Sequence, residues 1–462
     1  MKQINLKALS VLDGRYEKIV EELQNIFSEY GLIEQRVFVE ISWLQFIIKE
    51  LKLINFDISD SEIKTIQEIS DDFDIKAAKR IKTIEAKTNH DVKAVEYYIK
   101  ERLKAAGLLK LKEWIHFGCT SEDINNASYA IMIKKGKNVA KKHLESLISK
   151  IEWIAEYYQR IPMLSRTHGQ PASPTTIGKE FINFAFKINE ELKVLDNIKP
   201  CAKFNGASGN YNAHNFVFPN IDWIKASEKF ISEYLFVKST LYTTQINCYN
   251  YISEILHSIT RASSIIIDID RDMWGYISFG YFKQKLIEKE TGSSTMPHKI
   301  NPIDFENSEG NMGICISIAE HLAVKLLNSR FQRDLTDSTA LRNIGAIFGY
   351  FIIGIKSVLK GLDKIKPNFK IIQQDLTNNI ELLAEPIQTA MRVFNEEAPY
   401  EKLKELTRGK KVTKEELDSF IDRLQKTPEQ VKKKLKALTP TLYTGLAVAL
   451  TENYFEKYKK TS

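Results

Sequence analysis

The fold class is decided by residues 123–160, which read DINNASYAIMIKKGKNVAKKHLESLISKIEWIAEYYQR. Apolar residues recur there at helical spacing, as at Leu144, Leu147 and Ile151. Only Gly136 interrupts the pattern. Because an α-helix rises about 1.5 Å per residue, this stretch would form a helix roughly 50 Å long. Such a length exceeds that of an ordinary globular helix and predicts a bundle of long helices.

Four further stretches carry the same helical period, at residues 174–198, 249–279, 302–328 and 338–365. Strand signals are sparse, so we expect an all-α fold. Residues 344–355 have no charge and are apolar on every side of the expected helix. Since a peripheral helix normally meets water on one face, the bundle of one chain would not easily bury this stretch. We therefore expect the bundles of several chains to associate.

Lys-rich connections containing Pro367 and Pro440 punctuate the region that follows the long helices. We expect three parts: an N-terminal helical domain at residues 1–112, a central long-helix bundle at 113–365 and a C-terminal helical domain at 366–462. The central part would include a loop at 290–302 whose small residues permit movement. No repeat of fixed period and no low-complexity tract is present.

The composition predicts a globular, cytoplasmic protein. The 462 residues are 43% hydrophobic, which is enough for a large core. The formal charge of +7 is spread along the chain, whereas nucleic-acid binding requires a concentrated basic face. The N-terminus lacks the apolar core of a signal peptide. Residues 344–355 fall short of the roughly 20 apolar residues that span a bilayer, so we expect neither nucleic-acid nor membrane binding.

Several familiar kinds of site are missing from the sequence. There is no GxxxxGKS/T phosphate loop, no GxGxxG after a strand, no HExxH and no GxSxG. The eight histidines form no close pair and the four cysteines form no CxxC pair, so we expect reduced thiols and no metal. A nucleotide would have to be held by side chains and helix ends. The chemistry would be acid–base chemistry without a cofactor.

One polar segment, GSSTMPHKINP at residues 292–302, has the composition of an active-site lid. Its glycine and serines permit close approach to a ligand, and Lys299 and Asn301 supply donors for a carboxylate. A solvated linker between helices is the alternative interpretation. Met296 and Pro297, however, are not typical of linkers.

His168 stands in the segment RTHGQP, between one long helix and the next, so its ring would project from an end of the bundle. Gly169 and Pro171 leave little bulk around the ring. Thr167 and Gln170 offer hydrogen bonds that could fix its tautomer. Histidine is readily used as a general acid or base, and from this segment alone a catalytic and a structural role are equally open.

Two short segments near the N-terminus offer groups for binding anions. Asn89, His90 and Asp91 directly precede an expected helix. His90 could pair with a carboxylate or a phosphate, whereas Asp91 is the better candidate for the helix cap. Arg15 and Tyr16 place a guanidinium beside an aromatic ring.

A third anion-binding candidate is the segment around Asp337 and Ser338, which would cap a helix running on from Thr339. Arg333 and Arg342 stand on either side of it. Free N–H groups at a helix start and guanidinium groups both favour anions. Surface arginines near helix caps are common, so a structural role stays open for both.

Residues 292–302 closely resemble the GSSxMPxKxNP signature of the fumarase/aspartase superfamily of lyases. Other segments resemble the longer bacterial members that act on succinylated purine nucleotides: DGRY at 13–16, TNHDVK at 88–93, TSED at 120–123 and THGQP at 167–171. The likeness runs nearly from end to end. It implies an all-α fold of three domains, with long central helices shared in a homotetramer and each active site assembled from three subunits.

The resemblance also implies a reaction, a β-elimination that releases fumarate. One substrate would be a succinylated adenine nucleotide, giving AMP, and the other a succinyl-carboxamide ribotide earlier in purine synthesis. Ser293 would be the general base, with Ser294 as its rival, and His168 the general acid. Lys299 and Asn301 would take the succinyl carboxylates. By the same resemblance, the substrate-binding residues are Arg15, Tyr16, Asn89, His90, Asp91, Thr120, Ser121, Gln245, Lys299, Asn301, Arg333, Ser338 and Arg342.

Two kinds of alternative remain open from the sequence. Argininosuccinate lyase, aspartase and fumarase share the lid but would lack the phosphate grip, and the segments DGRY at 13–16 and NHD at 89–91 argue against them. A scaffold without catalysis, or a basic nucleic-acid-binding protein, is the second kind. A scaffold would be expected to lack one of the catalytic groups, yet Ser293, His168 and Lys299 are all present.

Overall fold

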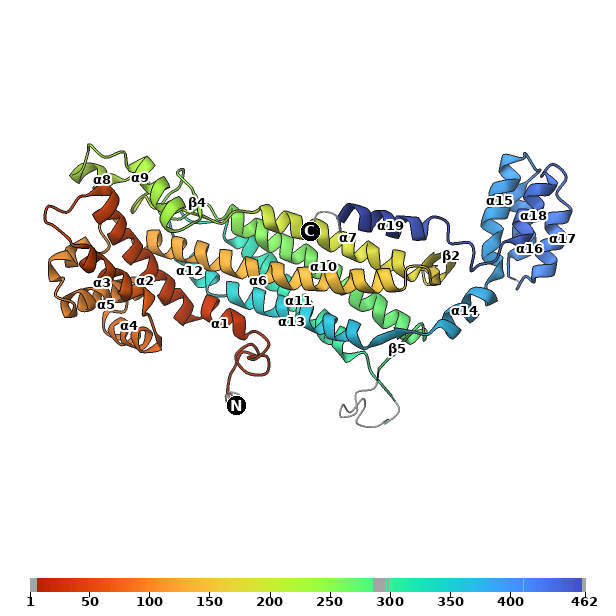
Figure 1. The fold of residues 1–462 in the computed structure, drawn as a ribbon, viewed down its shortest axis with the longest axis horizontal. Coiled ribbons are helices and arrows are strands. Elements are labelled where there is room, and N and C mark those ends of the chain that lie inside the picture. The colour runs from red at the N-terminus through yellow and green to blue at the C-terminus, as the bar shows by residue number, and fades with distance from the viewer. Residues whose placement is uncertain (1–5, 286–295, 297–298, 410, 459–462) are drawn as a thin grey trace. The chain divides into compact units, whose positions relative to one another are not determined.

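The computed structural model describes residues 6–285, 296, 299–409 and 411–458, and its ribbon is drawn in Figure 1. The chain divides into two compact units. Unit 1 consists of residues 1–144, 191–266 and 308–356, and unit 2 consists of residues 145–190, 267–307 and 357–462. The division into domains at residues 1–112, 113–365 and 366–462 stays a prediction.

Helices dominate both units. Those before residue 200 are α1 (Glu21–Phe27), α2 (Glu29–Phe46), the π-helical turn η1 (Ile47–Leu51), α3 (Asp60–Asp71), α4 (Ile75–Thr88), α5 (Asp91–Ala105), the 3-10 turn η2 (Leu109–Trp114), α6 (Ser121–Tyr157) and α7 (Ile177–Asn197). The next are α8 (Asn212–Val217), α9 (Trp223–Lys229), the π-helical turn η3 (Phe230–Tyr234), α10 (Asn250–Ser278), α11 (Ile303–Lys325), α12 (Thr336–Leu341) and α13 (Ile344–Lys364).

The remaining helices are α14 (Phe369–Asn378), the 3-10 turn η4 (Ile380–Leu383), α15 (Ala384–Val393), α16 (Pro399–Thr407), α17 (Lys414–Asp422), α18 (Glu429–Ala437) and α19 (Ala447–Tyr458). The described strands are short: β1 (Pro162–Thr167), β2 (Gln170–Thr176), β3 (Cys201–Ala202), β4 (Lys238–Ser239), β5 (Phe282–Gln284) and β6 (Ile365–Pro367). They form three two-stranded sheets, β1-β2 and β5-β6 antiparallel and β3-β4 parallel.

The five long helices predicted from the sequence are confirmed as α6, α7, α10, α11 and α13. Several helix ends differ from the prediction by up to three residues, and two differences change the kind of element. Residues 174–176 end strand β2 rather than begin a helix, and the pattern at 338–365 is interrupted between Leu341 and Ile344. The all-α class is correct, since the described strands are short additions to a helical chain.

Helix α13 is buried by its own chain, contrary to what its apolar sequence led us to expect. Phe348, Phe351 and Ile355 are fully buried in the single chain. Close approach at glycines makes this possible. A Cβ atom on Gly345 would lie 2.5 Å from Cβ of Phe27, and one on Gly354 would lie 2.5 Å from Cε of Met312. The apolar character of residues 344–355 is therefore not evidence that chains associate.

The same apolar helix bears on the expectation about membranes. Among the described residues, the segment Thr336–Lys364 is long and apolar enough to cross a membrane, judged by length and composition alone. This segment is longer than residues 344–355, the uncharged stretch that the sequence marked as too short to span a bilayer. The core helix of a folded bundle passes the same test, and most of this one is buried inside the chain.

Two apolar clusters organise the N-terminal part of unit 1. One joins α2 to α3, α4 and α5 and includes Val37, Ile66, Ile81 and Ile99. The other packs Trp43 of α2 with side chains of α6, α9 and η3. This packing holds the start of α6 against the helices that carry residues 89–91.

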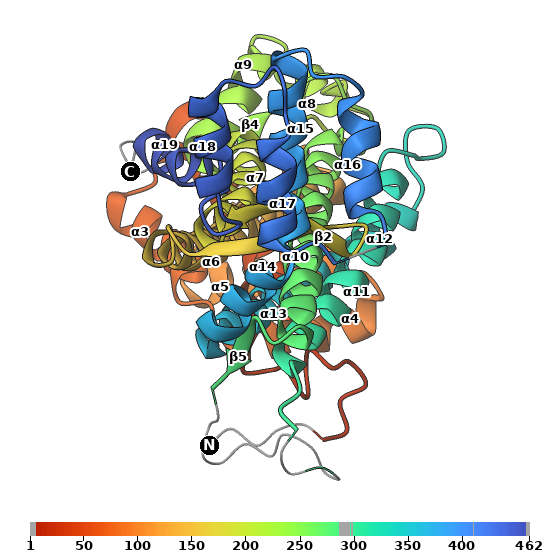
Figure 2. The ribbon, with the colours of Figure 1, turned by 90° about the vertical axis from the view of Figure 1, so that its right-hand side faces the viewer.

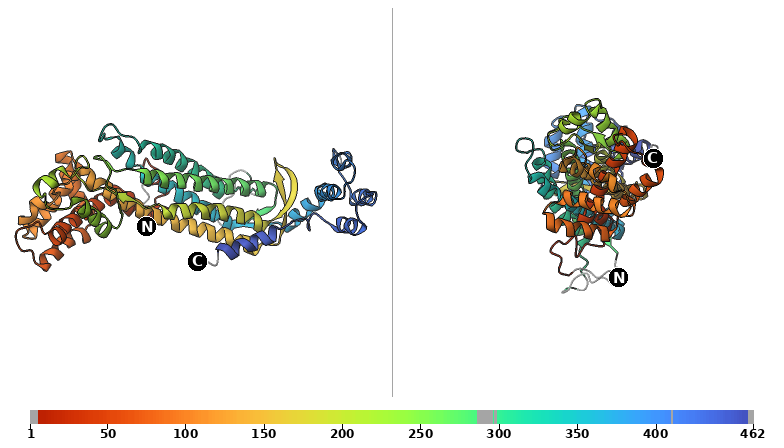
Figure 3. Two further views of the ribbon diagram at one scale, coloured as in Figure 1. Left: turned by 90° about the horizontal axis from the view of Figure 1, so that it is seen from above. Right: turned by 90° about the vertical axis from the view of Figure 1, so that its left-hand side faces the viewer.

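Unit 2 contains the hairpin of β1 and β2, drawn as paired strands in Figure 3. Its register places Thr167 opposite Gln170, with an irregularity between Met163 and Ser165. The C-terminal helices α15 to α18, labelled in Figure 2, pack around their own core, which includes Met391 and Ile421.

Candidate active site

The start of α6 carries the predicted residues Thr120 and Ser121. The backbone N–H of Thr120 donates to Oδ2 of Asp123 over 2.8 Å, which closes the first turn. Both residues are half-buried. The positive end of a long helix dipole and its free N–H groups favour an anion at this position.

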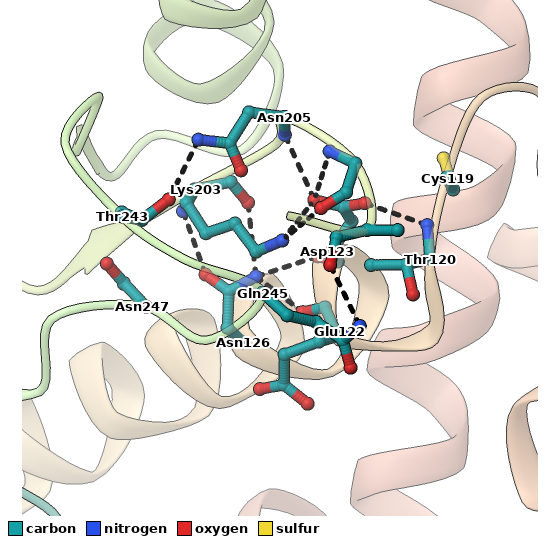
Figure 4. Close-up of polar contacts among 12 residues, drawn as sticks. Cys119, Thr120, Glu122, Asp123, Asn126, Lys203, Asn205, Thr243, Gln245 and Asn247 are labelled. Atoms are coloured by element: carbon teal, nitrogen blue, oxygen red, sulfur yellow. Dashed lines mark hydrogen bonds and ion pairs between the residues drawn. The ribbon is translucent and has the colours of Figure 1, made fainter. Parts of the chain in front are cut away.

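Asp123 forms a buried ion pair with Lys203, at 2.9 Å between Oδ1 and Nζ, and neither side chain is exposed (Figure 4). Oδ1 also accepts from the backbone N–H of Asn205 at 3.0 Å, and Lys203 donates to the carbonyl of Gly206 at 3.0 Å. Asn126 exchanges hydrogen bonds with the backbone of Lys203. A buried pair is tolerated only when its remaining donors and acceptors are satisfied in this way. The pair fixes residues 203–206 beside Thr120.

The neighbouring carboxylate, Glu122, has a different set of partners. Its Oε1 accepts from the hydroxyl of Tyr249 at 2.8 Å, and its Oε2 lies 3.2 Å from Nη2 of Arg333. Arg333 also donates from Nη1 to Oε1 of Gln245 at 3.0 Å. Two predicted substrate-binding residues, Arg333 and Gln245, are thus linked to Glu122. The sequence predicted no site role for Glu122.

The electrostatic environment of Glu122 opposes its charge. Burial raises the pKa of its carboxyl to about 7, although Arg333 lowers it and Asp337 adds to the rise. Burial also raises the pKa of Asp337, and its Oδ2 has no hydrogen-bond partner among the described residues. Burial holds the pKa of Tyr249 well above its usual value, so Tyr249 stays a donor.

Asp91, a predicted substrate-binding residue, is held by two arginines. Its Oδ2 lies 2.7 Å from Nη2 of Arg36 and 3.2 Å from Nη2 of Arg342, and its Oδ1 accepts from the N–H of Val92. Burial opposes the charge of Asp91, but Arg36 and that N–H outweigh it and lower the pKa of Asp91. Arg342 also pairs with Glu29 at 2.9 Å. The structure therefore brings Asp91 and Arg342 together.

The cap of α5 is His90, so the preference for Asp91 was wrong. Nδ1 of His90 accepts from the N–H of Lys93 at 3.2 Å. Asp91 lies inside the first turn, where its Oδ2 contacts Arg36 and its Oδ1 accepts from the N–H of Val92. Since Nδ1 accepts, a neutral ring carries its proton on Nε2. Its neighbour Asn89 is exposed and has a positive φ of 49°.

Helix α12 also begins differently from the prediction. It starts at Thr336 rather than at Thr339, and neither Asp337 nor Ser338 caps it. The cap residue is Leu335, which makes no side-chain cap hydrogen bond, and Oδ1 of Asp334 accepts from the N–H of Thr336 at 2.8 Å. Ser338 is half-buried inside the helix and donates its N–H to Oδ1 of Asp337 at 2.7 Å.

Arg15 and Tyr16 lie in the segment that precedes α1. The guanidinium of Arg15 is 5.8 Å from the centre of the Tyr16 ring, and Arg15 is exposed. The same segment borders a cavity of about 420 Å³ lined by Asp13, Phe27, Glu29 and Arg342, among others. Asp13 of the DGRY segment and Arg342 thus line the same cavity of unit 1, whereas Arg15 and Tyr16 do not line it.

His168 occupies the tip of the hairpin in unit 2. Its φ is 53° and that of Gly169 is 75°, the pair of positive values that a type I′ two-residue turn requires. Such a φ is costly for a residue with a side chain, and its presence is a reason to look for function. The ring is exposed. It therefore projects from a hairpin rather than directly from a helix end.

The base of this turn is held by Arg166. Its Nη2 lies 2.6 Å from Oδ2 of Asp375, and its Nη1 donates to the carbonyl of Gly169 at 3.5 Å. The guanidinium lies 4.5 Å from the ring centre of Phe279. The hydroxyl of Tyr281 donates to the same oxygen of Asp375. These contacts connect the turn of His168 to α14 and to the end of α10.

The lid segment is described only in part. Ser293 and Ser294 lie outside the described residues. Lys299 is exposed and Asn301 is half-buried, and the N–H of Lys299 donates to the carbonyl of Met296 at 3.0 Å. Gln284 donates to the carbonyl of Ile300 at 3.0 Å.

The predicted site residues therefore divide between the two units. Unit 2 contains His168, Lys299 and Asn301, and unit 1 contains Arg15, Tyr16, Asn89, His90, Asp91, Thr120, Ser121, Gln245, Arg333, Ser338 and Arg342. Within the part of the chain that the structure describes, no group of three or more His, Cys, Asp or Glu side chains could hold a metal ion. The arrangement offers anion-binding donors in unit 1 and an exposed imidazole in unit 2.

Comparison with known proteins identifies the class. A family described as Lyase matches residues 14–318. The fold is shared with a fumarate lyase from Mesorhizobium sp. BNC1, at a TM-score of 0.77 and 15% identity, covering 94% of this chain and 97% of that one. Fold and family match together define a lyase with the fumarase-like all-α fold. Residues 329–444 match a family described as Adenylosuccinate lyase C-terminal.

Two curated relatives are similar over nearly their whole length. The adenylosuccinate lyase of Vibrio cholerae is 50% identical over 450 residues, covering 97% of this chain and 98% of the relative. That of Escherichia coli K12 is 49% identical over 459 residues, covering 98% and 99%. The chain belongs to the adenylosuccinate lyase family.

Proposed function

We propose that the chain eliminates fumarate from adenylosuccinate to give AMP. It would act in the same way on succinyl-aminoimidazole-carboxamide ribotide, giving aminoimidazole-carboxamide ribotide, and so serve purine nucleotide biosynthesis in the cytoplasm. The observation that carries the proposal is the grouping in unit 1 of two arginines, Arg333 and Arg342, each fixed by carboxylates. Guanidinium groups and helix starts are the donors that a phosphorylated, dicarboxylic substrate needs.

The elimination requires a base and an acid at neighbouring atoms. Ser293, with Ser294 as its rival, acts as an alkoxide and takes up the proton from the carbon next to a succinyl carboxylate, which leaves the neutral hydroxyl and a dianionic aci-carboxylate. Lys299 and Asn301 stabilise that charge. The electron pair then forms the C=C bond of fumarate as the C–N bond breaks, and His168 donates a proton to the departing N6.

The geometry of His168 supports its role as the acid. The ring lies at the tip of a two-residue turn whose backbone conformation is strained. Arg166 holds this turn through its ion pair with Asp375. Strain of this kind persists where the surrounding structure enforces it, as at active sites. An imidazole is also the side chain most often used as a general acid or base.

The nucleotide end is assigned to unit 1. Arg333, Ser338 and Arg342 hold the phosphate and ribose, while His90 offers its Nε2–H to the phosphate. Arg15 and Tyr16 follow Asp13, which lines the cavity together with Arg342. Further substrate contacts are assigned to Asn89, Asp91, Thr120, Ser121 and Gln245.

We propose further that the protein is a homotetramer whose active sites each take groups from three subunits. An exposed apolar face on α11 supports this. Ile314 and Val324 are 48% and 60% exposed in the single chain. Gly310 and Gly313 on the same helix have open space where a side chain would point. A helix that exposes apolar side chains beside glycines is suited to packing against another chain.

The substrate assignment is tested by a screen. The purified chain is given adenylosuccinate, argininosuccinate, aspartate and malate in turn, and fumarate formation is followed by absorbance. Turnover of adenylosuccinate alone is expected. Turnover of any of the other three without turnover of adenylosuccinate would eliminate the proposal. A gel shift with DNA serves as the control for nucleic-acid binding, which is expected to be absent.

Shared active sites are tested by mixing two inactive variants. His168→Ala and Ser293→Ala remove groups that would come from different subunits of one site. Subunit exchange should therefore assemble some sites with neither defect and restore part of the activity. Exchange demonstrated by a labelled subunit, with no recovery of activity, would contradict shared sites.

A further inference from the structure

Glu122 is a buried carboxylate to which the proposed reaction gives no role. It lies in the first turn of α6, and its side chain is 3% exposed. Tyr249 donates to one carboxylate oxygen at 2.8 Å, and Arg333 contacts the other at 3.2 Å. Its neighbour Asp123 is occupied by Lys203. Glu122 is thus the carboxylate of this helix start that faces the nucleotide-binding arginine.

Two of the three nitrogens of Arg333 are held before any ligand binds. Nη2 contacts Glu122, and Nη1 donates to Gln245, whose own Nε2 donates to the carbonyl of Ala207 at 2.9 Å. A guanidinium has five N–H donors in a rigid plane. These two contacts therefore fix the plane of Arg333 and leave further N–H donors for a ligand. The side chain of Arg333 is 18% exposed, which keeps one edge accessible.

The charge of Glu122 is unfavourable for the fold. Burial and the nearby carboxylate of Asp337 raise its pKa to about 7, against the opposing effects of Arg333, Tyr249 and Lys203. A carboxylate retained where the fold disfavours its charge is a candidate for a functional role. The arrangement around Arg333 indicates what that role is.

We infer that Glu122 is a positioning residue for substrate binding, which together with Gln245 aims the guanidinium of Arg333 at an anionic group of the nucleotide. This inference rests on the proposed function, in which Arg333 holds that group. A donor already fixed in its bound orientation spares the substrate the entropic cost of ordering it. Loss of Glu122 should therefore weaken binding while the proton transfers continue.

The test is a double-mutant cycle in the full-length protein with adenylosuccinate as substrate. Glu122→Gln is expected to raise KM at least ~10-fold and to leave kcat within about twofold, because uniform binding is lost. In an Arg333→Ala background the same change should alter KM less than about twofold, since the residue through which Glu122 acts is gone. Glu122→Asp, which keeps the charge but withdraws it from Arg333, should reproduce the loss.

Glu96→Gln is the matched control. Glu96 is also a buried carboxylate, and it contacts Lys93 and Lys100, each at 2.8 Å, rather than Arg333. Its KM should equal that of the parent. An unchanged KM in Glu122→Gln, or equal effects with and without Arg333, would overturn the inference.

Failure of the proposed function gives a different result, an absence of turnover in the parent itself. The inference is then decided by calorimetric titration of the same proteins with AMP. Weaker AMP binding by Glu122→Gln only when Arg333 is present supports it, and equal binding by all variants, or none by the parent, overturns it.

Discussion

Arg166 and Asp375 form an ion pair of 2.6 Å that braces the turn on which His168 stands. The two residues come from β1 and α14, so the pair connects the hairpin to a helix far along the chain. Phe279 and Tyr281 face the same guanidinium at 4.5 Å and 5.9 Å from their ring centres. The turn is therefore held by contacts that a lysine would not reproduce.

Arg166→Lys should lower kcat about tenfold while KM changes less than about twofold, because a displaced general acid loses proton-transfer geometry rather than substrate affinity. Steady-state kinetics with adenylosuccinate measure both. Arg160→Lys is the control, since Arg160 forms an exposed ion pair with Glu452 at 2.9 Å and should tolerate the change. In a His168→Ala background, a further tenfold loss from Arg166→Lys would contradict an action through His168.

Glu122→Gln should stabilise the protein above pH 7. The folded pKa of about 7 exceeds the ordinary 4.5, so the folded chain binds this proton more tightly than the unfolded chain does. The corresponding stability is fully present below about pH 4.5 and is lost as the pH rises through 7. Gln cannot ionise and avoids the loss, which at 1.36 kcal/mol per pKa unit amounts to roughly 3 kcal/mol.

Unfolding by denaturant at pH 5 and pH 8 measures this difference. The variant and its parent should have similar free energies of unfolding at pH 5, and the variant should be the more stable at pH 8. A variant less stable than its parent at pH 8 would mean that the contact with Arg333 serves the fold rather than the substrate.

Ile314→Lys should dissociate the proposed homotetramer without unfolding the chain. The side chain is 48% exposed on α11, so a lysine can reach water in a free subunit, whereas a buried charge at an interface is costly. Sedimentation velocity reports the assembly and circular dichroism the fold. Ile224→Lys on α9 is the matched control, because Ile224 is 52% exposed and lies on a different helix. Retention of the tetramer by Ile314→Lys would remove α11 from the interface.

The long helices could be predicted from the sequence, but the turns could not. The helical period of residues 123–160 predicts α6 because one face of that helix is continuously apolar. The hairpin around His168 escaped notice because its strands are polar and lack the alternation that marks a half-buried strand. The choice of Asp91 as a cap failed because His90, one residue earlier, takes that position, while Asp91 also binds Arg36, which is distant in the sequence.

The site could be predicted only where a motif marked it. Thr120 and Ser121 belong to a recognisable segment, whereas Lys203 and Tyr249 carry no local signal. Both owe their importance to partners distant in sequence, Asp123 and Glu122. The buried α13 shows the same limit, because nothing local in its sequence reveals that its own chain covers it.

The turnover numbers of His168→Ala and Ser293→Ala with adenylosuccinate test the proposed acid and base most directly. Each variant should lose at least ~10²-fold in kcat, the usual scale for removing a positioned acid or base, while keeping the assembly of the parent. Near-normal turnover by either variant would remove that residue from its role and contradict the proposed chemistry.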